Sequence, residues 1–118
     1  MLVQDMDVYK KAHNLTLNIY RLTSVFPQNE VYGLTSQMRR ATVSINSNLA
    51  EGGARRSLKD KIHFIIMARG SVAELEYQCM LARDLQYLKS EVAQHLICDA
   101  RQIGQMLSGI IKKHTSNE

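Results

Sequence analysis

The residues able to do metal or nucleophilic chemistry are few and scattered along the chain. Glu91 and His95 are four residues apart, which places both on one helix face and would suit a single metal ion. Bundles that hold paired metals use Glu-x-x-His on two helices, and no Glu here has a His three residues on. Ser44 and Ser71 have no His nearby in the sequence to act as a base. We therefore predict no catalytic residue, no metal site, no cofactor and no small-molecule substrate, and expect that the protein is not an enzyme.

Basic side chains are concentrated in the centre of the sequence. The 118-residue chain has a net charge of +4, and residues 39–69 contain seven basic residues against two acidic ones. Such a cluster is typical of proteins that contact a phosphate backbone, although a basic surface can also serve solubility alone. Within the cluster, the side chains predicted to be free to touch a partner are Arg55, Arg56, Lys59 and Lys61.

A stripe of polar side chains runs through the same segment at three- and four-residue steps. Ser and Asn are poor helix formers, so their repetition inside a helical segment needs a reason. We favour a hydrogen-bonded network between helices or subunits that fixes their register. The alternative is a groove that binds a ligand or nucleotide. The predicted network comprises Gln37, Arg40, Ser44, Asn48 and Glu51, with possible partners in Arg69, Ser71, Glu74 and Gln78.

Four amphipathic segments must position these side chains, because apolar residues recur at helical spacing in each. Pro27 ends the first segment, since it biases the preceding residue away from helical angles. Gly52-Gly53 is interpreted as a stop signal, and Ser57 followed by Asp60 resembles a capping box. The predicted helices cover residues 7–25, 30–54, 58–87 and 91–113.

The short links between these helices predict an all-α, antiparallel up-down-up-down four-helix bundle, with one domain over residues 1–118. Cys79 and Cys98 are not in a CxxC pair and are interpreted as small apolar residues on helix faces. A secretory signal and a long apolar run are both missing from the sequence, so we expect a cytoplasmic protein of bacterial type that does not enter a membrane. The topology also predicts a basic end of the bundle, formed by Lys10, Lys11, Arg55, Arg56, Lys59, Lys61, Lys112 and Lys113, with Asp5, Asp7, Glu51, Asp60 and Glu118 as acidic neighbours.

Two ordered blocks of sequence carry a family resemblance. The first runs from Gly33 to Gly52 and contains Gly-Leu-Thr-Ser-Gln-Met-Arg-Arg-Ala, then Ser-Ile, then Asn-Leu-Ala-Glu-Gly. The second is Ala68-Arg-Gly-Ser-Val-Ala-Glu-Leu75, and Phe26-Pro27 with Glu30 matches the entry to the second helix. The chain resembles the "four helix bundle protein" family, whose founding members are encoded by intervening sequences within bacterial 23S ribosomal RNA genes.

The resemblance implies an up-down bundle that assembles into a ring-like homopentamer. The family is also similar to the accessory protein of diversity-generating retroelements, a basic pentameric barrel that binds nucleic acid and its reverse transcriptase. By that likeness, the candidate phosphate contacts are Arg39, Arg40, Arg55, Arg56 and Lys59.

The leading hypothesis is therefore an oligomeric helical scaffold that binds structured RNA or DNA electrostatically. The alternative is a protein-interaction module whose basic surface docks a partner protein, such as a nucleic-acid enzyme, with specificity from Val43 and Ala50. A metalloenzyme remains the third hypothesis. Because Val43 and Ala50 are predicted to face outward, we also expect self-association.

Overall fold

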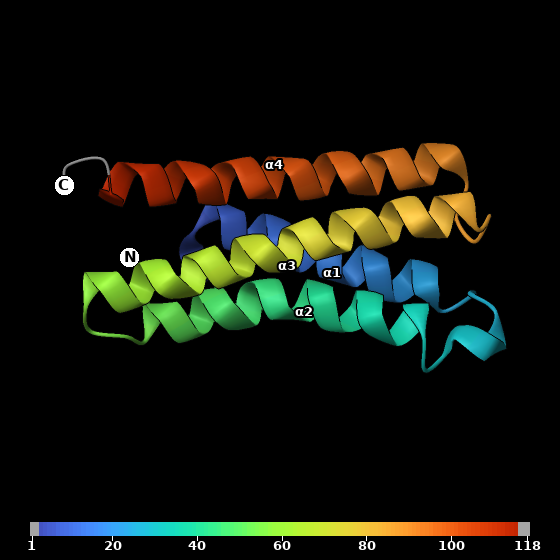
Figure 1. The fold of residues 1–118 in the computed structure, drawn as a ribbon, viewed down its shortest axis with the longest axis horizontal. Coiled ribbons are helices and arrows are strands. Elements are labelled where there is room, and N and C mark those ends of the chain that lie inside the picture. Colours follow the sequence, from blue (N-terminus) through green and yellow to red (C-terminus); the bar gives the residue numbers. More distant parts are fainter. Residues whose placement is uncertain (1–2, 116–118) are drawn as a thin grey trace.

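The computed structural model describes residues 3–115, and all regular structure within them is helical. Residues 1, 2 and 116–118 of the predicted domain, including Glu118, lie outside the described residues. The elements are η1 (Val3–Asp5), α1 (Asp7–Thr23), η2 (Gln28–Glu30), α2 (Leu34–Gly53), α3 (Leu58–Asp84) and α4 (Ser90–Thr115). The chain reverses direction at each link, so consecutive helices run antiparallel in a rod of 46 × 22 × 21 Å (Figure 1). The all-α class with four helices is confirmed.

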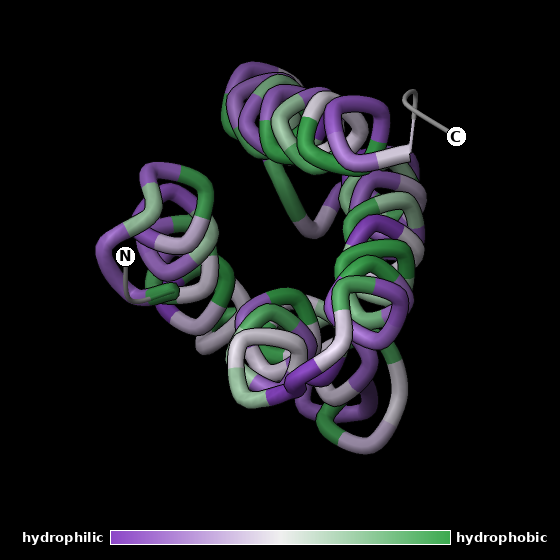
Figure 2. Tube along the Cα trace, turned by 90° about the vertical axis from the view of Figure 1, so that its left-hand side faces the viewer, coloured by the Kyte–Doolittle hydropathy of each residue, from purple (hydrophilic) through white to green (hydrophobic). Residues whose placement is uncertain are grey.

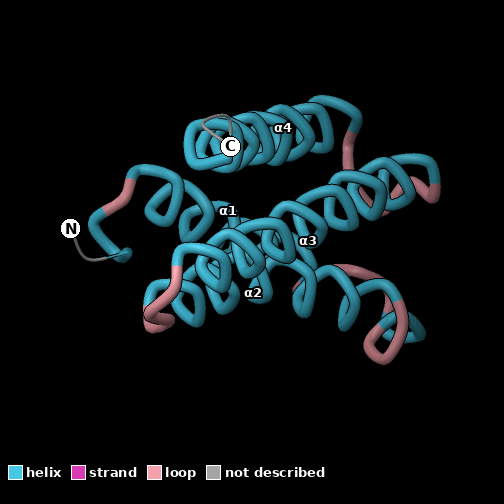
Figure 3. Tube along the Cα trace, turned by 60° about the vertical axis from the view of Figure 1, so that its left-hand side comes forward, coloured by secondary structure: helices cyan, strands magenta, loops and turns pink. Residues whose placement is uncertain are grey.

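The four helices surround a common axis, as the end-on view shows (Figure 2). α3 packs closely along α2 and α4, whereas α1 closes the ring against α2 and, more sparsely, α4. The links are confined to the two ends of the rod (Figure 3). Buried residues from every helix form one core, among them Leu15, Ile19, Met38, Ile45, Leu75, Ile97, Ile103 and Leu107.

α2 begins at Leu34, four residues later than the sequence analysis predicts. Residues 28–30 form a separate 3₁₀ turn, η2, and Glu30 acts as a cap beyond the helix. Its Oε1 accepts a hydrogen bond from the Leu34 backbone N–H at 3.1 Å, and its Oε2 accepts one from the Tyr87 hydroxyl at 2.8 Å. Glu30 therefore links the start of α2 to the α3–α4 link.

α3 ends at Asp84, so the predicted continuation to residue 87 is wrong. Gln86 adopts a left-handed conformation with φ of 65°. The Tyr87 N–H bonds to the Ala82 carbonyl and the Gln86 N–H to the Arg83 carbonyl, each at 2.9 Å. This is the Schellman arrangement, which usually has Gly at the left-handed position. Leu85, the first residue beyond α3, is 45% exposed.

Gly52 and Gly53 are the last residues of α2, and neither adopts a positive φ. The helix therefore ends where the stop signal predicts, but not through a glycine in the left-handed conformation. A Cβ at Gly52 would lie 2.9 Å from the Phe64 Cβ and 3.3 Å from the Lys61 carbonyl oxygen. Gly52 is thus required by the close approach of α2 and α3. The predicted cap of α3 is confirmed, because the Ser57 Oγ accepts a hydrogen bond from the Asp60 N–H at 3.1 Å.

Candidate functional site

The α2–α3 link lies at the same end of the rod as the start of α1 and the finish of α4 (Figure 1). We call this the basic end, and it comprises residues 3–10, 51–64 and 106–115. Arg55 is partly engaged there: its Nη2 lies 2.7 Å from the Glu51 Oε1, and its guanidinium lies 4.8 Å from the centre of the Phe64 ring. The Lys61 Nζ donates to the Gly53 carbonyl at 3.3 Å.

Other cationic side chains at the basic end remain available. Arg56 and Lys59 are exposed, and neither forms an ion pair or side-chain hydrogen bond with another residue between 3 and 115. The same holds for Lys10, Lys112 and Lys113, whereas Lys11 pairs with Asp99 of α4 at 3.5 Å. The acidic neighbours within the described residues are Asp5, Asp7, Glu51 and Asp60.

Arg39 and its neighbour Arg40 do not lie at the basic end with the other candidate phosphate contacts. Arg39 is engaged by α1. It is fourteen residues before Gly53, the last residue of α2, which corresponds to about 21 Å along the helix. Its Nε donates to the Thr23 Oγ1 at 2.9 Å and its Nη2 to the Tyr20 carbonyl at 3.2 Å. Its guanidinium also lies 4.7 Å from the centre of the Tyr20 ring. Arg39 therefore fastens α2 to α1.

The polar stripe is brought together only in part. The Ser44 and Ser71 hydroxyls form a hydrogen bond across the α2–α3 seam, and the Asn48 amide donates to the Ser44 hydroxyl at 3.2 Å. The remaining members form separate pairs or none. Glu51 binds Arg55, Glu74 accepts from Gln78, Arg69 reaches Ser108 of α4, and Gln37 and Arg40 are exposed without a side-chain partner among residues 3–115.

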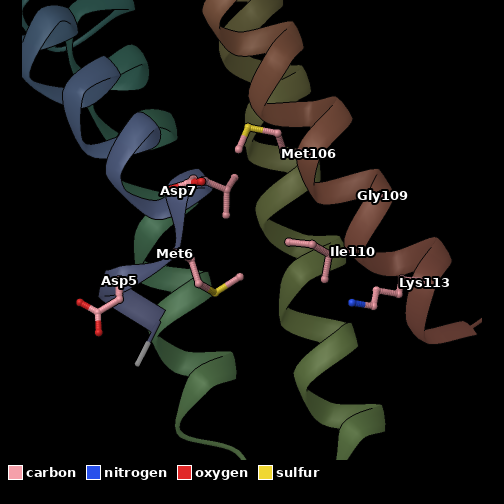
Figure 4. Close-up of a pocket in the computed structure, with 8 residues that line it drawn as sticks. Asp5, Met6, Asp7, Met106, Gly109, Ile110 and Lys113 are labelled. Carbon is pink, nitrogen blue, oxygen red and sulfur yellow. The ribbon is translucent and has the colours of Figure 1, made fainter. Parts of the chain in front are cut away.

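Two hollows lie at the basic end, on either side of η1. One, of about 470 Å³, separates the start of α1 from the end of α4 (Figure 4). Its walls are mostly apolar: Met6 faces Met106 and Ile110, and Val8 adds to the lining. Lys113 also lines this hollow. The other, of about 490 Å³, is lined chiefly by Val3, Leu49, Ala50 and Ile65.

The outward face of α3 carries an apolar stripe that the sequence analysis missed. Ile66 and Tyr77 are 43% and 63% exposed, and Gly70 and Ala73 lie between them on the same face. Together with its buried residues, this stripe makes α3 apolar on opposite sides. The spacing of residues 66, 70, 73 and 77 is helical, so the signal was present in the sequence as a second apolar face.

The cysteines and acidic residues offer little reactive chemistry. Burial raises the pKa of the Cys79 thiol to about 12, with a smaller effect from Glu76, so this thiol stays protonated at neutral pH. Cys98 is exposed rather than on an apolar face, which corrects the prediction. Glu91, His95 and Cys98 line one shallow surface of α4, yet no group of three or more ligating side chains among residues 3–115 has a geometry that fits a metal ion.

Comparison with known proteins extends this description. The sequence matches the family described as 23S rRNA-intervening sequence protein over residues 4–109. A crystal structure of a protein of unknown function, from the S23 ribosomal protein family of Bacteroides thetaiotaomicron, is similar with a TM-score of 0.80. The two chains are 24% identical, and the alignment covers 89% of this chain and 98% of that one, a likeness that shows the fold alone. No curated protein sequence matches.

The fold and its exposed cationic side chains define a four-helix bundle with a basic end. Because the family match covers most of the sequence, the chain belongs to the 23S rRNA-intervening sequence protein family. Within residues 3–115, none of the helices combines the length and apolar character needed to cross a bilayer.

Proposed function

We propose that this protein is a non-catalytic, self-associating helical scaffold that binds the phosphate backbone of structured RNA or DNA at its basic end. One observation carries the proposal. Arg56 and Lys59 come from the middle of the chain and Lys112 and Lys113 from near its end, yet all four are exposed at one end of the rod without an ion-pair partner in residues 3–115. Clustered, unneutralised cations are what a polyanion requires.

The chemistry of the basic end favours backbone contacts over base recognition. Proteins that read single strands usually stack bases on exposed aromatic rings. The aromatic side chains that are most exposed among residues 3–115 are Tyr32 and Tyr77, and neither belongs to the basic end. Phe64 is at this end, but Arg55 covers its ring. We therefore expect little dependence on sequence and a strong dependence on salt.

The test is a salt titration of binding to a mixed-sequence duplex, made of RNA and then of DNA. Each lost phosphate contact should lower the slope of log K against log salt by about 0.9. The variant Arg56→Ala/Lys59→Ala should therefore lose about 1.8 of that slope. The matched control, Arg21→Ala/Lys89→Ala, removes two exposed cations at the opposite end and should leave the slope unchanged. Binding without any salt dependence would refute the proposal.

Self-association is supported by the apolar stripe on α3. A helix that is apolar on opposite sides is normally buried on both, and within one copy the stripe of Ile66, Gly70, Ala73 and Tyr77 has no cover. We expect light scattering to give a mass that is a multiple of 13.4 kDa, with five copies if the family resemblance extends to assembly. Tyr77→Asp should reduce that mass. A wild-type mass near 13.4 kDa would contradict self-association.

A further inference from the structure

A second exposed surface lies along α1 and α2, away from the basic end. Of the large apolar side chains exposed within residues 3–115, six fall between Leu17 and Val43. A shallow groove of about 350 Å³ runs between the two helices here. It is lined by Tyr20, Val31, Thr35, Ser36, Arg39, Arg40 and Val43, and with Leu17 these residues form what we call the α1–α2 face.

The charge of this region has one sign. Between residues 8 and 50 the only carboxylate is Glu30. Both of its oxygens already accept hydrogen bonds, from the Leu34 N–H and the Tyr87 hydroxyl. The groove itself contains Arg39 and Arg40, and Arg40 has no side-chain partner among residues 3–115. Any occupant of the groove therefore meets apolar surface and positive charge together.

The groove is also held in shape before anything binds. Arg39 bonds to Thr23 and to the Tyr20 carbonyl, and its guanidinium packs on the Tyr20 ring. The Tyr20 ring is thereby fixed at the groove wall. Aromatic and Arg side chains that are fixed in advance cost little entropy when a partner binds, which is why such residues dominate binding energy at protein interfaces.

We infer that the α1–α2 face binds an acidic amphipathic helix of a second protein. A groove between two helices accepts a third helix through apolar residues at three- and four-residue spacing. Those residues would contact Tyr20, Val31 and Val43, and flanking carboxylates would meet Arg40. Exposed aliphatic side chains favour a protein over a nucleic acid, since Leu17 and Val43 cannot stack on bases. This inference does not depend on the basic end.

The test is selection from a displayed library of helical 16-residue peptides against the full chain, followed by affinity measurement of the selected peptides. We expect the selected sequences to be acidic, with apolar residues at helical spacing. Val43→Asp should weaken their binding about tenfold or more. Gln102→Asp introduces the same charge at an exposed position of α4 and should have no effect. Circular dichroism should confirm that both variants fold.

Three outcomes would overturn the inference. One is the selection of no peptide, or of peptides whose affinity Val43→Asp leaves unchanged. Another is a wild-type oligomer that Val43→Asp converts to monomer, because a second copy would then occupy the face. The third is a single-stranded oligonucleotide that binds the wild type and is lost in Val43→Asp but retained in Gln102→Asp.

Discussion

The two ends of the rod use their polar and aromatic side chains in opposite ways. At the end that holds the α1–α2 and α3–α4 links, which we call the closed end, Glu30 bonds to Leu34 and Tyr87. The Phe26 ring lies 5.3 Å from the Tyr87 ring, so the two links are joined. At the basic end, by contrast, two apolar hollows flank η1, and Arg56 and Lys59 have no partner among the described residues.

This difference between the two ends implies that one contributes mainly to the stability of the fold and the other to binding. Phe26, Glu30 and Tyr87 at the closed end engage one another or the backbone, so changing them should alter the free energy of unfolding. Exposed cations at the basic end add little to stability, because surface charges rarely contribute more than about 1 kcal/mol. Because Arg56 and Lys59 form no ion pair among residues 3–115, they remain free to bind an anionic partner. Substitutions at the two ends should therefore produce effects of different kinds.

The largest expected effect comes from the only two phenylalanines, one at each end. Phe26 is buried, 8% exposed, and Phe26→Ala should cost about 3 kcal/mol of unfolding free energy. Phe64 is only half-buried beneath Arg55, and Phe64→Ala should cost about 1 kcal/mol. Urea denaturation measures both. Equal losses would break the proposed contrast between the ends.

A second prediction concerns the cations at the end of α4. Lys112→Ala/Lys113→Ala should lower duplex affinity about tenfold at 0.1 M salt, since two phosphate contacts are lost. The free energy of unfolding should change by no more than about 0.5 kcal/mol, as expected for exposed positions. Fluorescence anisotropy and urea denaturation give the two quantities. A large loss of stability without a loss of affinity would reverse the roles assigned to the ends.

The sequence was sufficient to predict the helices and much of the basic end, and physical reasons explain the remainder. Leu15, Ile45 and Leu107 each belong to a series of apolar residues at helical spacing within their own helix, so their burial follows from periodicity alone. Arg39 was placed with the phosphate contacts because charge along a sequence does not reveal which side chains a neighbouring helix engages. Its bonds to Tyr20 and Thr23 arise only once α1 and α2 pack.

Helix ends were predicted least well, because their signals were unconventional. Gly52 looked like a stop signal but is a packing residue, while the real left-handed position holds Gln86. Gln86→Gly should remove the strain of a side chain in that conformation and stabilise the closed end by about 1 kcal/mol. Gln94→Gly, in the second turn of α4, is the matched control and should destabilise by about 1 kcal/mol. If both variants lose stability in urea, the left-handed conformation of Gln86 does not destabilise the folded protein.

The smallest effect that sharpens the comparison is a pH dependence at the closed end. The Leu34 N–H, and then the Tyr87 hydroxyl, stabilise the charged form of Glu30 and lower the pKa of its carboxyl below the ordinary value of 4.5. The unfolded chain therefore takes up a proton at higher pH than the folded one. The contribution of Glu30 is complete above pH 4.5 and is lost as the pH falls through the lowered pKa.

The variant Glu30→Gln should accordingly lose less stability than the wild type when urea midpoints are compared at pH 7 and pH 3. Glu91→Gln removes an exposed carboxylate from the first turn of α4, where no side-chain hydrogen bond to a described residue holds it, and should follow the wild type.

The hydrogen bond from the Tyr87 hydroxyl to Glu30 also raises the pKa of Tyr87 above its ordinary value of 10. The contribution of Tyr87 to stability is therefore present below pH 10 and is lost as the pH rises through the raised value. Tyr87→Phe should abolish this alkaline loss and part of the acid one. If Glu30→Gln and the wild type respond alike to acid, Glu30 does not join the two links, and the closed end must depend on its aromatic contact alone.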